Sequence, residues 1–359
     1  MRECFRLAVR GEGLVSPNPM VGALIVEHGR IAARGYHRRY GAAHAEIDCL
    51  SRFHGDPRRA TMYVNLEPCS HHGKTPPCAD AILAAGIRNV VVAMRDPNPL
   101  VSGKGISKLR RGGVKVRTGI LEQEARELNR VFVRHITARR PYVHVKVAQT
   151  LDGKIAPPSG RPIRISSPES LDLVHRWRAS HDAVMVGAGT VIADRPRLTV
   201  RRVKGRNPDV VVLDGRFRVP LAARVFSKTW KRRAFVCIGE PAARANRRKV
   251  LTAEKRGVIV VPLPARGGRF RMRTLLRALY RYNIGSVLVE GGSDVFRTMA
   301  EEGPIDAISL FVAPRILGTG VPAFGGAVAR RCRPLKETGC AVQRVGTDVL
   351  LQSWFDGGR

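Results

Sequence analysis

Three residues in the first part of the chain could bind a metal ion, and a fourth could transfer protons beside it. His44 and Glu46 lie two positions apart, and Cys69 and Cys78 follow with eight residues between them. One imidazole and two thiolates suit tetrahedral zinc, and three protein ligands leave the fourth position open for water. An open position is typical of catalytic rather than structural zinc. The sequence therefore predicts a Zn²⁺ site formed by His44, Cys69 and Cys78.

The spacing around these ligands indicates the reaction. His-x-Glu followed by Pro-Cys-x-x-Cys is the signature of zinc deaminases, in which the Glu moves protons while zinc activates water. His44 and Glu46 match it, which makes Glu46 the candidate catalytic residue. The spacing between Cys69 and Cys78 departs from this signature, which has two residues between the cysteines rather than eight. We nevertheless expect Cys78 to be a ligand, because two prolines precede a helical pattern that starts at Cys78, and a helix N-terminus favours a thiolate. A closed site with His71 or His72 as fourth ligand, or ordinary buried thiols, are the alternatives.

The elements that must position these residues alternate between strands and helices, which indicates an α/β fold. The first half has strand patterns at 21–26, 61–66 and 89–94, and helical patterns around 43–53, 77–85 and 122–137. The segment 138–141 breaks the last helix before a strand that begins at Tyr142. We therefore expect two domains, 1–138 and 142–359.

The second half repeats the alternation with longer apolar runs. Such strands, separated by helices, predict a mostly parallel sheet with helices on its faces. No Gly-x-Gly-x-x-Gly follows a strand, although Gly291 and Gly292 lie between a strand and a helix and could hold a phosphate. The expected strands are 182–188, 209–214, 234–239, 257–262, 286–290 and 307–314, and the clearest helices are 272–282 and 295–302.

Composition limits the class of protein. The 63 Lys and Arg against 29 Asp and Glu give a net charge of +34, which suits a polyanion or an anionic small substrate. The basic runs 231–233 and 244–249 contain few aromatic residues, so we favour a solvated basic surface over nucleic-acid binding. Seven cysteines favour a metal or reactive thiol over disulfides. The absence of long apolar runs and of a signal sequence predicts a cytoplasmic protein without membrane contact. Whether it is a homo-oligomer stays open.

Longer segments resemble the bifunctional deaminase-reductase of riboflavin biosynthesis. The deaminase half is represented by SPNPMVG (16–22), HAE (44–46), LEPCSHHGKTPPC (66–78) and DPNP (96–99). The reductase half continues through LDGKIA (151–156), ISSPES (165–170), GAGTVIADRPRLTVR (187–201), LVEGG (288–292) and APRILG (313–318). The resemblance implies a cytidine-deaminase-like α/β/α domain followed by a dihydrofolate-reductase-like α/β domain, with Zn²⁺ and NADPH as cofactors.

The resemblance also implies the reactions and their residues. A phosphorylated pyrimidine, 2,5-diamino-6-ribosylamino-4(3H)-pyrimidinone 5′-phosphate, would be deaminated, and its ribosyl group would then be reduced to ribityl by NADPH. The implied deaminase substrate contacts are Asn18, His71, Lys74, Asp96 and Asn98. The implied reductase active-site residues are Lys146, Asp194 and Glu290. The implied cofactor contacts are Ala148, Arg164, Thr190, Asp194, Gly291, Gly292, Ser293 and Asp294. The implied reductase substrate contacts are Arg178, Leu198, Arg201 and Glu290.

Two positions depart from the family pattern in the second half. Arg164 stands where many members have Trp, and Arg195 stands where many have Asp. The first change removes apolar surface beside the nicotinamide, whereas the second adds positive charge near phosphorylated ligands. These departures leave open an active deaminase with an inactive or altered reductase. A second alternative takes the net charge of +34 as primary, and is a nucleic-acid-binding protein with a structural zinc. The affinity for nucleic acid would then fall steeply as the salt concentration rises.

Overall fold

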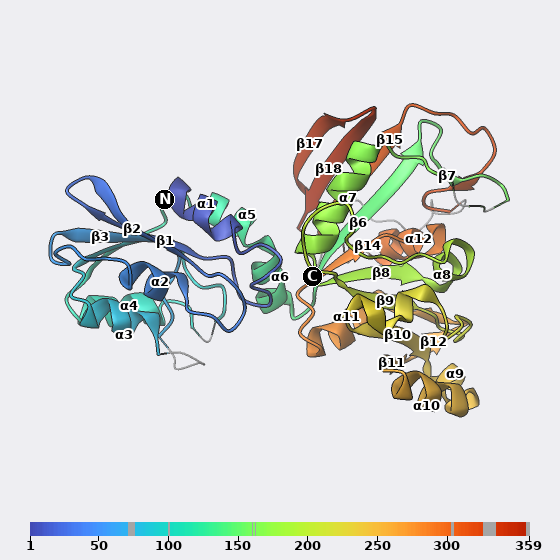
Figure 1. Ribbon diagram of the computed structural model, residues 1–359, viewed down its shortest axis with the longest axis horizontal. Coiled ribbons are helices and arrows are strands. Elements are labelled where there is room, and N and C mark those ends of the chain that lie inside the picture. Colours follow the sequence, from blue (N-terminus) through green and yellow to red (C-terminus); the bar gives the residue numbers. More distant parts are fainter. Residues whose placement is uncertain are drawn as a thin grey trace. The chain divides into compact units, whose positions relative to one another are not determined.

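The computed structural model describes residues 1–70, 76–99, 101–159, 161, 163–302, 305–325 and 335–356. The chain divides into two compact units, Met1–Arg139 and Arg140–Arg359, which Figure 1 colours from blue to green and from green to red. Within the described residues, no helix has both the length and the apolar character needed to cross a membrane.

The first unit contains a five-stranded sheet in the order β2-β1-β3-β4-β5. β1 pairs antiparallel with β2 and β3, whereas β3, β4 and β5 run parallel. The carboxyl ends of β3 and β4 therefore lie at one edge of the sheet, where the segments bearing Cys69 and Asp96 begin. The strands are β1 (Gly22–Glu27), β2 (Arg30–Tyr36), β3 (Ala60–Leu66), β4 (Asn89–Met94) and β5 (Lys115–Thr118).

Helices cover both faces of this sheet, which confirms the expected α/β/α arrangement. Figure 1 shows α1 and α5 on one face and α2, α3 and α4 on the other. Buried side chains of β1, β3 and β4, such as Ile25, Met62 and Val92, form the core with Ile82 of α3 and Leu109 of α4. The helices are α1 (Arg2–Val9), α2 (Ala45–Leu50), α3 (Cys78–Ala84), α4 (Lys104–Arg111), α5 (Glu122–Leu128) and α6 (Arg130–Ala138).

The prediction of one helix over residues 122–137 is wrong, because α5 and α6 are separated at Asn129. This residue has φ −98° and ψ 22° and is 2% exposed. Its side-chain Oδ1 accepts the backbone N–H of Met20 at 2.8 Å, and its Nδ2 donates to the Met20 carbonyl at 3.0 Å. The amide thus fixes the break by binding backbone 109 positions away in sequence, a contact that helical periodicity does not reveal.

The second unit contains a nine-stranded sheet in the order β11-β10-β9-β8-β14-β6-β15-β18-β17. The strands from β11 to β15 in this order run parallel, which confirms the expected mostly parallel sheet, and β18 and β17 continue it antiparallel. The strands are β6 (Tyr142–Thr150), β8 (Ala183–Gly187), β9 (Asp209–Leu213), β10 (Ala234–Gly239), β11 (Val258–Leu263), β14 (Ser286–Val289), β15 (Ala307–Ala313), β17 (Glu337–Val345) and β18 (Asp348–Phe355). Short strands β7 (Lys154–Ala156), β12 (Ala265–Arg266), β13 (Arg269–Phe270) and β16 (Val321–Pro322) form two separate pairs.

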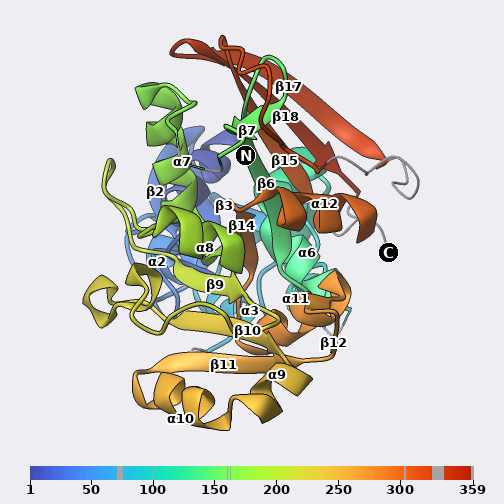
Figure 2. The same cartoon turned by 90° about the vertical axis from the view of Figure 1, so that its right-hand side faces the viewer.

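Alternate residues of these strands enter two different cores. Met185 of β8 packs in a cluster with residues of α11 and α12, whereas its neighbours Val184 and Val186 pack in a cluster with residues of α8 and α10. Figure 2 shows α11 and α12 on the side of this sheet opposite α8. The helices are α7 (Pro168–Ser180), α8 (Ala188–Asp194), α9 (Glu240–Ala245), α10 (Arg247–Lys255), α11 (Met272–Arg281) and α12 (Ser293–Glu302), with 3₁₀ turns at Arg224–Phe226 and Lys228–Trp230.

Two buried histidines join β6, the end of α7 and β15. His181 Nδ1 donates to the Trp177 carbonyl at 2.7 Å, so its Nε2 accepts from His144 Nδ1 at 3.3 Å. His144 Nε2 in turn accepts from the Ser309 hydroxyl at 2.8 Å. His181 then carries a single proton, on Nδ1, and is neutral. Burial lowers the pKa of His181 accordingly.

This arrangement predicts an acid-sensitive second unit. Below about pH 6.5 His181 becomes protonated in the unfolded chain but not in the folded chain. The free energy of unfolding therefore decreases as the pH is lowered, by at most about 1.4 kcal/mol per pH unit from this residue. Tryptophan fluorescence during urea unfolding reports this unit, since Trp177, Trp230 and Trp354 all lie in it. His181→Gln should flatten the dependence on pH, and His28→Gln, an exposed control, should not. Equal slopes in the wild type and His181→Gln would contradict the assignment.

Candidate active sites

Three ends of secondary structure meet at the predicted metal ligands. His44 is the N-cap of α2, Cys69 follows β3, and Cys78 is the first residue of α3. Their ligand atoms lie within 4.8 Å of one another, with His44 Nδ1 at 3.2 Å from Cys78 Sγ and 3.6 Å from Cys69 Sγ. The structure thus brings the three residues to one point despite the long loop between the cysteines.

The chemistry of this donor set fits zinc. Hydrogen bonds from Cys78, including its backbone N–H at 3.2 Å, lower the pKa of the Cys69 thiol and so favour the thiolate form that zinc binds. A thiolate, a second sulfur and an imidazole nitrogen are the ligands of catalytic zinc sites with an open fourth position. The alternative of a closed site depends on His71 or His72, which lie outside the described residues.

Glu46 lies on the first turn of α2, two residues after His44. Its side chain is buried, with 4% exposed, and burial raises its pKa to about 7. A carboxyl group with such a pKa both accepts and releases a proton near neutral pH, which is the property required of a general acid and base.

A cavity of about 380 Å³ opens onto these residues. His44, Glu46 and Cys69 line it together with three predicted substrate contacts, Asn18, Asp96 and Asn98. The remaining predicted contacts, His71 and Lys74, lie outside the described residues. The cavity therefore combines two of the metal ligands, a proton carrier, and amide and carboxylate groups able to bind a polar ring.

Glu67, which sequence reasoning missed, fixes the surroundings of Cys69. Its carboxylate is 3% exposed and accepts four backbone N–H groups. The donors are Asp96 at 3.2 Å, Gly103 at 2.9 Å, Gly105 at 2.9 Å and Ile106 at 3.2 Å. One side chain next to the metal ligand segment thus ties down both the loop bearing Asp96 and the start of α4.

Sequence reasoning also missed His37 and part of the apolar wall. His37 Nδ1 donates to the Ala43 carbonyl at 3.0 Å, and its Nε2 accepts from the Asn18 amide at 3.3 Å, so this histidine orients Asn18. Burial lowers the pKa of His37, which keeps the ring neutral. Phe132 and Ile136 of α6 complete the wall. No local motif marks any of the three, because their role arises only on folding.

The second unit holds a buried ion pair among the predicted reductase residues. Arg178 of α7 binds Glu290, which follows β14, through two hydrogen bonds of 2.6 and 2.7 Å. Burial would raise the pKa of Glu290, but Arg178 and Lys146 outweigh it and lower that pKa. Burial lowers the pKa of Lys146 on β6, and Glu290 partly opposes this effect. Lys146, Arg178 and Glu290 therefore form one electrostatic cluster.

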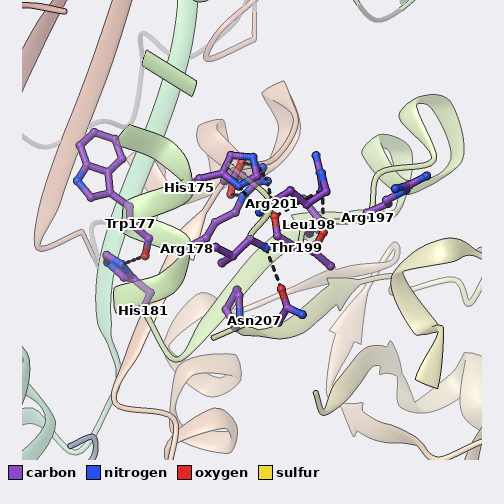
Figure 3. A network of polar contacts seen from close by, with 12 residues as sticks. His175, Trp177, Arg178, His181, Arg197, Leu198, Thr199, Arg201 and Asn207 are labelled. Atoms are coloured by element: carbon purple, nitrogen blue, oxygen red, sulfur yellow. Dashed lines mark hydrogen bonds and ion pairs between the residues drawn. The ribbon is translucent and has the colours of Figure 1, made fainter. Parts of the chain in front are cut away.

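Arg201 joins this cluster through His175. The backbone N–H of Arg201 donates to His175 Nδ1 at 3.0 Å, and the Arg201 guanidinium donates to the Thr199 hydroxyl at 2.8 Å. Figure 3 shows the side chains of His175, Arg178 and Arg201 gathered between α7 and the segment after α8. Burial and the two arginines lower the pKa of His175 to about 4, so it is neutral. Leu198, by contrast, points its side chain into the core, so any substrate contact would come from its backbone.

Glycine is required at the turn between β14 and α12. A Cβ at Gly291 would lie 2.8 Å from Val186 Cα, and Gly292 has φ +72° with Thr190 Oγ1 only 3.0 Å from the position of a Cβ. The two glycines therefore let the turn pack closely against β8 and α8 at the start of the ten-residue helix α12. The predicted phosphate contact at this turn stays a prediction.

The other predicted cofactor contacts are spread over three elements and one loop. Thr190 and Asp194 both lie on α8, one turn apart, and burial raises the pKa of Asp194. Ser293 and Asp294 occupy the first turn of α12. α8 and α12 follow the carboxyl ends of β8 and β14, the edge at which parallel sheets bind ligands. The last two contacts are Ala148, half-buried on β6, and Arg164, an exposed residue whose carbonyl accepts from Arg315 at 2.9 Å.

Known protein families and solved structures are similar to this chain over nearly its whole length. Residues 1–94 match the cytidine and deoxycytidylate deaminase zinc-binding region, and residues 141–351 match the RibD C-terminal domain. The riboflavin biosynthesis protein RibD of Aquifex aeolicus is 40% identical, covering 98% of this chain and 96% of its own, and that of Escherichia coli is 35% identical, covering 89% and 88%. A crystal structure of a diaminohydroxyphosphoribosylaminopyrimidine deaminase/5-amino-6-(5-phosphoribosylamino)uracil reductase from Thermotoga maritima is 37% identical, with a TM-score of 0.86 and coverage of 99% and 97%.

Proposed function

The chain belongs to the RibD family of bifunctional riboflavin-biosynthesis enzymes, and from this we propose how its residues divide the two reactions. It deaminates 2,5-diamino-6-ribosylamino-4(3H)-pyrimidinone 5′-phosphate and then reduces the ribosyl group to ribityl, with Zn²⁺ and NADPH as cofactors. We assign deamination to Met1–Arg139 and reduction to Arg140–Arg359. The observation that carries the assignment is the meeting of His44, Cys69 and Cys78 beside the buried Glu46.

In the first unit, Glu46 moves the protons. Zinc held by His44, Cys69 and Cys78 would supply an activated water at neutral pH. Glu46 takes up the proton that water loses when its oxygen adds to the ring carbon bearing the amine, and gives that proton to the nitrogen that leaves as ammonia. Its pKa near 7 suits both steps. Asn18, held by His37, orients the pyrimidine together with Asp96 and Asn98.

In the second unit, Lys146 supplies the proton. When bound, NADPH would supply a hydride to C1′ of the ribosylamino group, and the ring oxygen released from C1′ requires a proton to become the new hydroxyl of the ribityl chain. The Lys146 ammonium beside Glu290 has a pKa lowered by burial, which eases that transfer. The cationic side chains of Arg178 and Arg201 orient the anionic substrate, while the turn at Gly291 and Gly292 receives the cofactor phosphate.

The zinc assignment is tested by Cys78→Ser with metal analysis. We expect one zinc per wild-type chain. The variant should hold markedly less, because a hydroxyl is a far weaker zinc ligand than a thiolate, and ammonia release should fall in proportion to the zinc lost. Cys49→Ser, at a buried thiol outside the cluster, is the matched control and should keep its zinc. Full zinc and full deamination in Cys78→Ser would remove Cys78 from the site.

Arg195 offers a test of the reductase surface. It is exposed at the end of α8 with φ 45°, a conformation that Asp tolerates, so Arg195→Asp should fold. If its charge attracts a phosphorylated ligand, the variant should raise the NADPH or substrate KM about threefold at low salt, and the difference should shrink as salt screens the charge. Arg256→Asp, exposed at the end of α10, is the control. An unchanged KM at low salt would make Arg195 an ordinary surface residue.

A further inference from the structure

The first unit contains a second cavity, of about 500 Å³, and the described residues that line it are all different from those that line the deaminase cavity. We call it the basic cavity. No Asp or Glu is among its described lining residues. Its polar groups are the hydroxyls of Ser70, Ser102 and Ser107 and the cationic side chains of Lys104, Lys108 and Arg111.

The basic cavity adjoins the deaminase cavity at two places. Cys69 lines the deaminase cavity, and the next residue, Ser70, lines the basic cavity. Likewise, Val101 lines the deaminase cavity and the next residue, Ser102, lines the basic cavity. Because consecutive Cα atoms are only about 3.8 Å apart, the walls of the two cavities lie next to each other at these two places.

One face of α4 supplies most of the lining. Lys104, Ser107, Lys108 and Arg111 are spaced at i, i+3, i+4 and i+7, which places them on the same side of a helix. Glu67 already occupies backbone N–H groups of Gly103, Gly105 and Ile106 at the start of this helix. Binding in the basic cavity therefore depends on side chains rather than on the helix N-terminus.

The cations of the basic cavity are only partly neutralised. Lys108 pairs with Asp80 at 2.5 Å. Lys104 and Arg111 are exposed, and neither side chain has a hydrogen-bond or ion-pair partner within the described part of the chain. Cationic donors together with hydroxyl donors suit the several acceptor oxygens of a phosphate dianion. An anion would also relieve the repulsion among the three positive charges.

We propose that the basic cavity binds a phosphate group. The nearest source is the 5′-phosphate of the deaminase substrate, which hangs on a ribose from the ring in the neighbouring cavity. This source rests on the proposed function. Free phosphate or another phosphorylated compound presents the same chemistry, so the experiment separates the two.

The test removes the three cations with Lys104→Gln, Lys108→Gln and Arg111→Gln in one variant. The matched control, Arg110→Gln, Lys115→Gln and Arg117→Gln, removes the same charge from exposed positions of this unit outside the lining. Deamination kinetics at low salt are measured with the phosphorylated substrate and with its dephosphorylated riboside. We expect the variant to raise KM for the phosphorylated substrate about tenfold with little change in kcat, and to leave KM for the riboside unchanged.

Calorimetric titration of each full-length protein with inorganic phosphate forms the second arm. The cavity variant should bind one phosphate fewer per chain than the wild type and the control. A lost phosphate site with an unchanged KM would support a phosphate cavity that serves a ligand other than the substrate. Equal effects in the control, or no effect in either arm, would overturn the proposal. If the wild type released no ammonia, the proposed function would fail, and the titration alone would decide the cavity.

Discussion

Glu46→Gln is expected to slow ammonia release by at least about 10²-fold, the contribution typical of a general acid and base. Gln has nearly the same shape and keeps a hydrogen-bonding oxygen, but it cannot take up and return a proton. Glu46 is buried beside the metal ligands and its pKa lies near 7, so the wild-type side chain can both take up and release a proton at neutral pH. Zinc content should stay at the wild-type level, since His44, Cys69 and Cys78 are untouched.

The same variant should leave reduction intact. With the deaminated intermediate supplied, NADPH oxidation by Glu46→Gln should match the wild type, because Glu46 and Lys146 lie in different units. Glu12→Gln, at a carboxyl outside the cavity, controls for loss of a charge in the first unit. Loss of both activities in parallel would argue against assigning one reaction to each unit.

Lys146→Gln is expected to produce the reciprocal result. NADPH oxidation with the deaminated intermediate should fall about 10²-fold or more, since Gln cannot donate the proton that accompanies the hydride. Ammonia release from the diamino substrate should be unchanged. The loss should appear in kcat, while NADPH binding, followed by cofactor fluorescence, should stay close to that of the wild type.

A pH profile separates this role from a purely structural one. The pKa of Lys146 is lowered by burial, so the wild-type rate should decline on the alkaline side as the ammonium loses its proton, and Lys146→Gln should lack this limb. Lys255→Gln, at an exposed position of α10, is the control for charge. Wild-type reduction by Lys146→Gln would remove Lys146 from the chemistry.

The sequence was most informative where structure is encoded locally. The strands expected at 89–94 and 234–239 have these bounds in β4 and β10, because continuous apolar runs suit strands covered on both faces. β2 and β17 were missed, because most of their residues are exposed and their polar residues carry no such signal. The spacing of His44 and Glu46 is also local, since an N-cap and the first turn of α2 bring them together.

The rest of the site depends on contacts between distant segments. Glu67 binds the backbone of Gly105, 38 residues away, and Asn129 binds that of Met20, 109 residues away. Neither residue belongs to a motif, and a buried acid or amide cannot be recognised before its partners are known. The break between α5 and α6 was missed for this reason. The basic cavity also appeared only with the fold, which brings Ser70 and one face of α4 to the same cavity.

The central claim is that one chain performs both reactions in sequence, and the most direct test supplies the diamino substrate and NADPH together. Ammonia release and NADPH loss are followed separately in the same sample. We expect ammonia to appear first and NADPH loss to follow with a lag and reach one NADPH per ammonia, whereas omitting NADPH should leave ammonia release unchanged. NADPH oxidation without ammonia release, or ammonia release with no NADPH consumed, would contradict the account.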